Sequence, residues 1–147
     1  MNVQSLKEYN EVETYFHATS KRECDEIARH ALEVGKVELI GRPMGDHAEK
    51  RSGAQWSEWA GWGQGFVYAL DFYSREGCWE YAQVPGSPAS EGAMFILGYD
   101  GVSEVDPEVE NDCEIVVPLS GYEVIAVIVL EDDEEIVYEP MQWAKAR

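Results

Sequence analysis

The chain has 147 residues, of which 45% are hydrophobic and 12% aromatic, and its formal net charge is −18. This composition is too apolar for a disordered chain, and the length fits one folded domain spanning residues 1–147. The longest apolar run, Val124 to Leu130, is far too short to cross a bilayer, so a membrane protein is not expected.

The acidic side chains are concentrated in the second half of the chain. Residues 1–75 carry 12 acidic and 9 basic side chains, whereas residues 76–144 carry 17 acidic side chains and no basic one. Such a field repels phosphate backbones and attracts cationic surfaces. Nucleic acid is therefore an unlikely partner and a protein with a basic surface a better one, although solubility alone also explains the charge.

The cysteines and the first residues indicate the compartment. Cys24, Cys78 and Cys113 are odd in number, widely spaced and without a Cys-x-x-Cys pair. This favours reduced thiols over a disulfide framework or a zinc site. Residues 1–13 lack the basic and then apolar plan of a signal peptide. We expect a cytoplasmic protein without a bound metal.

The first half of the chain predicts alternating strands and helices around one long loop. Ser20 with Glu23 has capping-box spacing at a helix start, and Gly35 suits its end. Tryptophans 56, 59 and 62 have the spacing of one helical turn inside the loop. The predicted elements are a strand at 13–18, a helix to residue 34, a strand at 36–40, a loop at 41–64, a strand at 66–70 and a helix at 72–82.

The second half predicts mainly strands. They fall at 93–99, 113–117, 122–130 and 135–138, with an acidic loop at 100–112. Asp132 and Asp133 stand where a two-residue hairpin turn belongs, without the usual glycine. The pattern as a whole predicts an α+β fold with mostly antiparallel strands and one or two helices in the N-terminal half.

Three segments each place one polar, reactive side chain in or beside an apolar run. They are Tyr-Phe-His-Ala-Thr-Ser at 15–20, Gly-Gln-Gly-Phe-Val-Tyr-Ala at 63–69 and Asp-Cys-Glu-Ile-Val-Val-Pro at 112–118, with His17, Tyr68 and Glu114 as the polar residues. In this order they resemble the His-Tyr-Glu type of the ADP-ribosyltransferase fold, to which diphtheria toxin belongs. The family patterns are His-Gly-Thr or His-Gly-Ser, Gly-x-Gly-hydrophobic-Tyr-hydrophobic, and a glutamate opening a strand that ends in proline.

The resemblance spans residues 15–130 and implies a fold and an activity. The implied fold is a split β-sandwich of two mostly antiparallel sheets with NAD bound between them. The implied activity is mono-ADP-ribosylation of a protein with NAD as substrate, as in a bacterial or phage effector. His17, Tyr68 and Glu114 are then expected to line one cleft. Ala18 departs from the family, which has glycine at that position.

The resemblance also implies a role for each candidate residue. Glu114 would stabilise the positive charge that develops on the ribose, and His17 would hydrogen-bond the adenosine-side ribose. Tyr68 and Tyr81 would sandwich the nicotinamide ring. The remaining expected NAD contacts are the main chain of Ala18, the side chain of Thr19, and Arg42, whose guanidinium suits the pyrophosphate.

Each of the three motif residues also has a purely structural explanation. Glu114 fits a solvated strand end, His17 a core histidine bonded to a carbonyl, and Tyr68 ordinary strand packing. The main alternative function is an acidic binding protein on the same fold that blocks a basic, nucleic-acid-binding partner without catalysis. A third is NAD hydrolysis or 2′-phosphate transfer to NAD, and the scarcity of basic residues after Arg75 argues against its RNA version.

Overall fold

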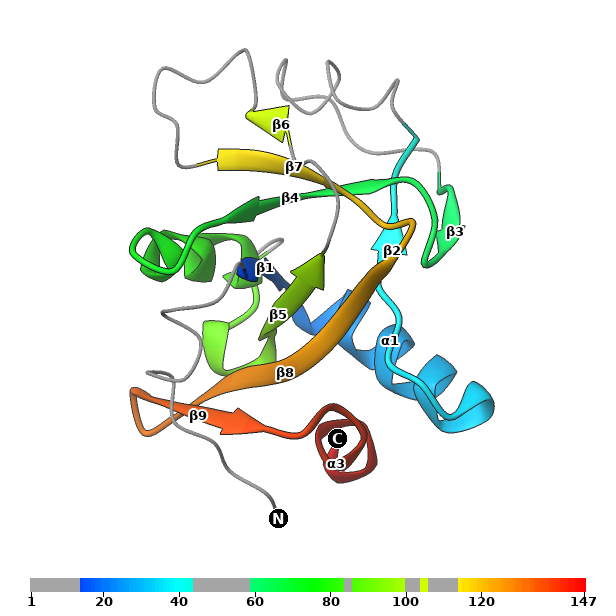
Figure 1. Ribbon diagram of the computed structural model, residues 1–147. Helices are drawn as coiled ribbons and strands as arrows, with labels where there is room; N and C mark the ends of the chain where they lie inside the picture. The colour runs from blue at the N-terminus through cyan, green and yellow to red at the C-terminus, as the bar shows by residue number, and fades with distance from the viewer. Residues whose placement is uncertain (1–13, 44–58, 84–85, 100–103, 106–113) are drawn as a thin grey trace.

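The computed structural model describes residues 14–43, 59–83, 86–99, 104–105 and 114–147, and it has an α+β architecture (Figure 1). A seven-stranded antiparallel sheet has the order β6-β7-β4-β1-β5-β8-β9, and β2 and β3 form a small second sheet. The strands are β1 (Thr14–Thr19), β2 (Ile40–Gly41), β3 (Gly61–Trp62), β4 (Phe66–Leu70), β5 (Ala93–Tyr99), β6 (Glu104–Val105), β7 (Glu114–Pro118), β8 (Tyr122–Glu131) and β9 (Glu134–Tyr138).

The large sheet changes direction between β1 and β4. β1 pairs with β5 along its whole length, from Thr14 to Thr19, but its register with β4 consists of the single pair Phe16 and Leu70. Figure 1 shows β4 and β7 running obliquely to β5 and β8. The two separate sheets of the expected sandwich are therefore, in this structure, two halves of one sheet that meet at that pair.

Alternating side chains build a core on each face of the sheet. On one face Phe95 and Leu97 pack under the helices α1 (Lys21–Val34) and α3 (Pro140–Ala146). On the other face Met94 and Ile96 pack against the 3₁₀ helix η2 (Arg75–Gln83), and a shorter 3₁₀ helix, η3 (Ala89–Glu91), lies next to it. We call these the α1 face and the η2 face. Because successive side chains of β5 point to opposite faces, this one strand contributes to both hydrophobic clusters.

The predicted helix start and stop at α1 are confirmed, but the capping box is not. Ser20 has the extended conformation of an N-cap, yet its side chain makes no capping hydrogen bond. The carboxylate of Glu23 binds the side chains of Thr19 and Arg42 instead. At the other end Gly35 is left-handed, with φ 79°, and donates its N–H to the Ala31 carbonyl at 2.8 Å.

Other expected elements differ from the structure. The strand expected at 36–40 is reduced to β2, and the helical turn expected around the tryptophans is wrong for Gly61 and Trp62, which form β3. Trp56 lies outside the described residues. The helix expected at 72–82 is η2, a 3₁₀ helix that begins at Arg75.

The C-terminal helix α3 was not predicted. Glu139 is its N-cap and accepts hydrogen bonds from the main-chain N–H groups of Met141 and Gln142, and Pro140 occupies the first turn. Within the described ranges, no helix is long and apolar enough to span a membrane. The same part of the chain holds no group of three or more histidine, cysteine or acidic residues that could bind a metal ion.

Candidate functional site

The three motif strands are consecutive neighbours in the sheet. β4 lies between β1 and β7, so the strands that carry His17, Tyr68 and Glu114 are adjacent although they are far apart in the chain. β4 and β7 are paired along all five residues, with Tyr68 opposite Val116 and Leu70 opposite Glu114. The chain topology thus brings the backbones of the three motifs together.

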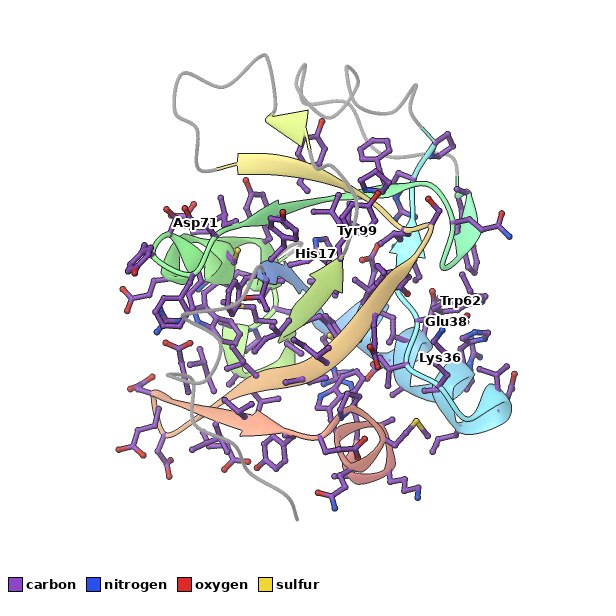
Figure 2. All side chains as sticks on the ribbon, in the orientation of Figure 1. His17, Lys36, Glu38, Trp62, Asp71 and Tyr99 are labelled. Carbon is purple, nitrogen blue, oxygen red and sulfur yellow. The ribbon has the colours of Figure 1, made fainter. Side chains whose placement is uncertain are left out.

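His17 links β1 to β4 through its side chain. Its Nδ1 lies 2.7 Å from the main-chain oxygen of Tyr68, and the ring is half-buried. Figure 2 shows it near the centre of the molecule, between β4 and β5. Because a carbonyl oxygen only accepts, the neutral ring must carry its proton on Nδ1. Nε2 is then a hydrogen-bond acceptor, the role that a ligand hydroxyl requires.

The side chains of His17 and Tyr68 lie on opposite faces of the sheet. His17 is paired with Phe95, which belongs to the α1 face. Tyr68 is two residues before Leu70, which is paired with Phe16 and packs on the η2 face. Tyr68 is 5% exposed, and its ring packs edge-on against Phe66 at 5.7 Å. The expectation that both side chains line one cleft is therefore wrong.

A shift of one residue explains this result. The family pattern places its tyrosine one hydrophobic residue after Gly-x-Gly, whereas here Phe66 and Val67 both stand between Gly65 and Tyr68. In a strand, one residue of shift moves a side chain to the other face. Val67 therefore occupies the α1 face, the face of His17, and is buried in its core.

Glu114 is described by its backbone alone. It opens β7 and is paired in register with Leu70. Its side chain, together with all of Asp112 and Cys113, lies outside the described residues. The catalytic role of Glu114 accordingly stays a prediction.

Arg42 and Thr19 both bind one acidic side chain. Arg42 Nη2 donates to Glu23 Oε1 at 2.6 Å, and the Thr19 hydroxyl donates to Glu23 Oε2 at 2.5 Å. We call this group of three residues the Glu23 clamp. Its side chains are largely buried, with 14% of Arg42 and 28% of Glu23 exposed. In the structure, the guanidinium that was expected to hold a pyrophosphate thus holds a carboxylate.

Ala18 and Tyr81 lie on the η2 side of the sheet. Ala18 is 4% exposed and belongs to the η2-face core, and Tyr81 is 42% exposed on η2. Tyr81 thus lies on the side of the sheet that Tyr68 faces and His17 does not. The structure leaves the NAD contacts of both residues as predictions.

The Gly-x-Gly segment meets the chain around Arg42 at very short range. A Cβ on Gly65 would lie 2.3 Å from the Arg42 carbonyl oxygen, and a Cβ on Gly41 would lie 1.5 Å from the Gln64 oxygen. Arg42 and Phe66 also exchange both main-chain hydrogen bonds, at 3.1 and 2.9 Å. These glycines are explained by the close approach of two backbone segments.

Sequence reasoning missed a cluster around His30. The His30 ring stacks on Trp62 at 4.0 Å and 4°, and its Nε2 lies 3.0 Å from Glu38 Oε2. Trp59 packs edge-on against Trp62 at 5.3 Å. Trp62 and Glu38 are labelled in Figure 2 beside α1. No local pattern could have signalled this group, because its members come from α1, from the segment before β2, and from β3 with the residues just before it.

The two described cysteines are structural. Burial raises the pKa of Cys24 to about 12, and its thiol contacts the Thr19 carbonyl at 3.6 Å. Cys78 is buried and donates to the Phe16 carbonyl at 3.3 Å. A thiol with so high a pKa is a poor nucleophile at neutral pH.

Comparisons with protein-family models, with curated proteins and with solved structures find no match to this chain.

Proposed function

We propose that the protein is an NAD-dependent mono-ADP-ribosyltransferase that modifies a protein with a basic surface, on a variant of the split-sandwich fold. One observation carries the proposal. The three strands that bear the His-Tyr-Glu motifs are consecutive in the sheet, and His17 is hydrogen-bonded to the main chain of Tyr68. Sequence spacing alone does not bring these motifs together.

The chemistry needs NAD held in place and a carboxylate beside its nicotinamide-side ribose. Cleavage of the nicotinamide–ribose bond develops positive charge on the ribose, as in glycoside hydrolysis. In this proposal His17 Nε2 accepts a hydroxyl of the adenosine-side ribose, and its position is set by the bond from Nδ1 to Tyr68. Glu114, which opens β7 and is paired with Leu70 of the η2 face, supplies the carboxylate to the nicotinamide-side ribose, so in this proposal NAD contacts both faces of the sheet.

The proposal changes the role of Tyr68. Its ring packs on Phe66, on the face opposite His17, so it does not share a ligand surface with the His17 ring. Tyr68 acts in this proposal through its main-chain carbonyl, which fixes the tautomer and the orientation of the His17 ring.

Turnover of labelled NAD in the presence of basic acceptor proteins tests the proposal. Glu114→Gln should lower the rate by ~10²-fold or more and leave NAD affinity nearly intact, because the charge it stabilises appears only in the transition state. Glu123→Gln, which removes one exposed carboxylate from β8, is the matched control and should keep full activity. A fully active Glu114→Gln protein would refute the mechanism.

A second candidate function is an acidic binding protein without catalysis. Two observations favour it: the opposite faces of His17 and Tyr68, and the run of exposed acidic side chains at 131–134 on the tip of the β8–β9 hairpin. Thermal shift separates the two candidates. Stabilisation by millimolar NAD supports the transferase, whereas salt-sensitive binding to a basic protein with no effect of NAD supports the binding protein.

A further inference from the structure

The Glu23 clamp has the donor chemistry of an anion site. Its two donors are the Thr19 hydroxyl, just before α1 in the sequence, and the Arg42 guanidinium, after α1. They bind the two oxygens of the Glu23 carboxylate, Arg42 at 2.6 Å and Thr19 at 2.5 Å. A guanidinium and a hydroxyl bind phosphate oxygens with the same geometry, and charge-assisted bonds of this kind are strong. Glu23 therefore occupies donors that a phosphate can also use.

The clamp is held on the motif strands. Thr19 follows His17 by two residues on β1, so both side chains project from the same face, about 6.7 Å apart along the strand. The Arg42 main chain is bonded in both directions to Phe66, the first residue of β4. A ribose hydroxyl on His17 and a phosphate on Thr19 and Arg42 would therefore be neighbours, as they are in a nucleotide.

We propose that Glu23 closes a phosphate site formed by Arg42 and Thr19, and that the diphosphate of NAD opens it by displacing the carboxylate. This inference rests on the proposed function for the identity of the ligand but not for the site itself. Glu23 is an internal competitor: the site is available only in the fraction of molecules in which its carboxylate has left Arg42. The apparent affinity for a phosphate ligand is reduced by that fraction.

Removing the competing charge should tighten binding. We expect Glu23→Gln to bind inorganic pyrophosphate and NAD on the order of tenfold more tightly than the unaltered protein, as measured by calorimetry at fixed salt. Glu23→Gln combined with Arg42→Gln should lose this gain. Asp25→Asn is the matched control, because it removes a carboxylate of the same helix that pairs with Lys21 and Arg147.

Two outcomes overturn the proposal. Equal pyrophosphate affinity in Glu23→Gln and the unaltered protein means that the clamp is structural only. An equal gain in Asp25→Asn means that net charge alone is responsible. If Glu23→Gln does not fold, Glu23→Asp replaces it: its carboxylate is one methylene shorter, and a smaller gain is expected.

Measuring pyrophosphate binding and NAD turnover separately distinguishes this proposal from the proposed function. Tighter pyrophosphate binding by Glu23→Gln without NAD turnover supports the phosphate site and counts against the transferase. Turnover that depends on Glu114, with NAD and pyrophosphate affinities unchanged in Glu23→Gln, supports the transferase and refutes the closing role of Glu23.

Discussion

The Nδ1 atom of His17 lies 2.7 Å from the main-chain oxygen of Tyr68, beside the one residue pair that joins β1 to β4. A side chain thus completes the connection between two halves of the sheet at the point where few main-chain bonds cross. The bond gives His17 a structural role that can be separated from any ligand contact, because Nδ1 serves the first and Nε2 the second.

His17→Ala and His17→Asn should separate these roles. Alanine leaves the buried Tyr68 carbonyl without this donor, at a cost of about 1–3 kcal/mol in the free energy of unfolding. The Asn amide nitrogen takes the place of Nδ1, so His17→Asn should recover much of that loss in denaturant titrations. Neither variant should bind NAD as well as the unaltered protein, since both lack Nε2. Equal stability losses in the two variants would show that the hydrogen bond is not what matters.

The turn between β8 and β9 should be improved by glycine. Asp132 and Asp133 have φ angles of 51° and 64°, left-handed values that aspartate tolerates and glycine adopts at no steric cost. Asp133→Gly should therefore stabilise the fold by about 0.5 kcal/mol or less in chemical denaturation, because the greater freedom of glycine in the unfolded chain offsets part of the relieved strain. Asp133→Ala removes the same negative charge from the acidic run at 131–134 but keeps a Cβ at the positive φ angle. An equal gain from alanine would assign the effect to charge.

This turn belongs to the part of the fold that the sequence predicts well. Asp132 and Asp133 stand between two apolar runs, so their position alone indicates the hairpin, and Gly35 ends α1 by the same kind of local rule. Glu139 followed by Pro140 is also a recognisable helix start, so α3 could have been predicted from the sequence.

The site is less predictable because it depends on contacts between distant segments. The strand at 66–70 was predicted correctly, but the face that Tyr68 occupies follows from the Phe16–Leu70 register, which no local pattern contains. Glu23 was expected to cap its own helix and instead binds Arg42, a residue that reaches it only after the chain has turned back past α1. Local rules predict what a side chain can do, and tertiary packing decides with which partner.

The close approach of the backbone at Gly41 to that at Gln64 predicts that alanine costs much more stability at Gly41 than at Gly86. At Gly41 a Cβ would overlap the Gln64 carbonyl oxygen, at 1.5 Å, and neither backbone can move without breaking the Arg42–Phe66 hydrogen bonds. Gly41→Ala should thus cost more than about 3 kcal/mol or prevent folding. Gly86 also resists a side chain through its φ of +85°, but nothing lies within 4 Å, so Gly86→Ala should cost about 1 kcal/mol. Similar losses in thermal unfolding would contradict the assignment of Gly41 to steric contact.

Stability should fall on the alkaline side because of two buried acids. Burial raises the pKa of Cys24 from 9.0 to about 12 and that of Tyr122 from 10.0 to about 12. Below pH 9 both groups are neutral in the folded and unfolded chains, so their contribution is fully present. As the pH rises further the unfolded chain loses these protons first, and the contribution disappears by about pH 12.

Cys24→Ala and Tyr122→Phe should each flatten this alkaline decline, by on the order of 1 kcal/mol per pH unit between pH 10 and 12. Tyr122→Phe should also cost about 1–3 kcal/mol at every pH, because the Leu39 N–H that donates to the Tyr122 hydroxyl at 2.7 Å loses its buried acceptor. Tyr73→Phe is the control and should leave the slope unchanged, since Tyr73 is 79% exposed in the folded protein. Urea titrations at half-unit pH steps measure the slopes. A decline as steep in Cys24→Ala as in the unaltered protein would show that the buried thiol stays accessible to hydroxide through local opening, without global unfolding.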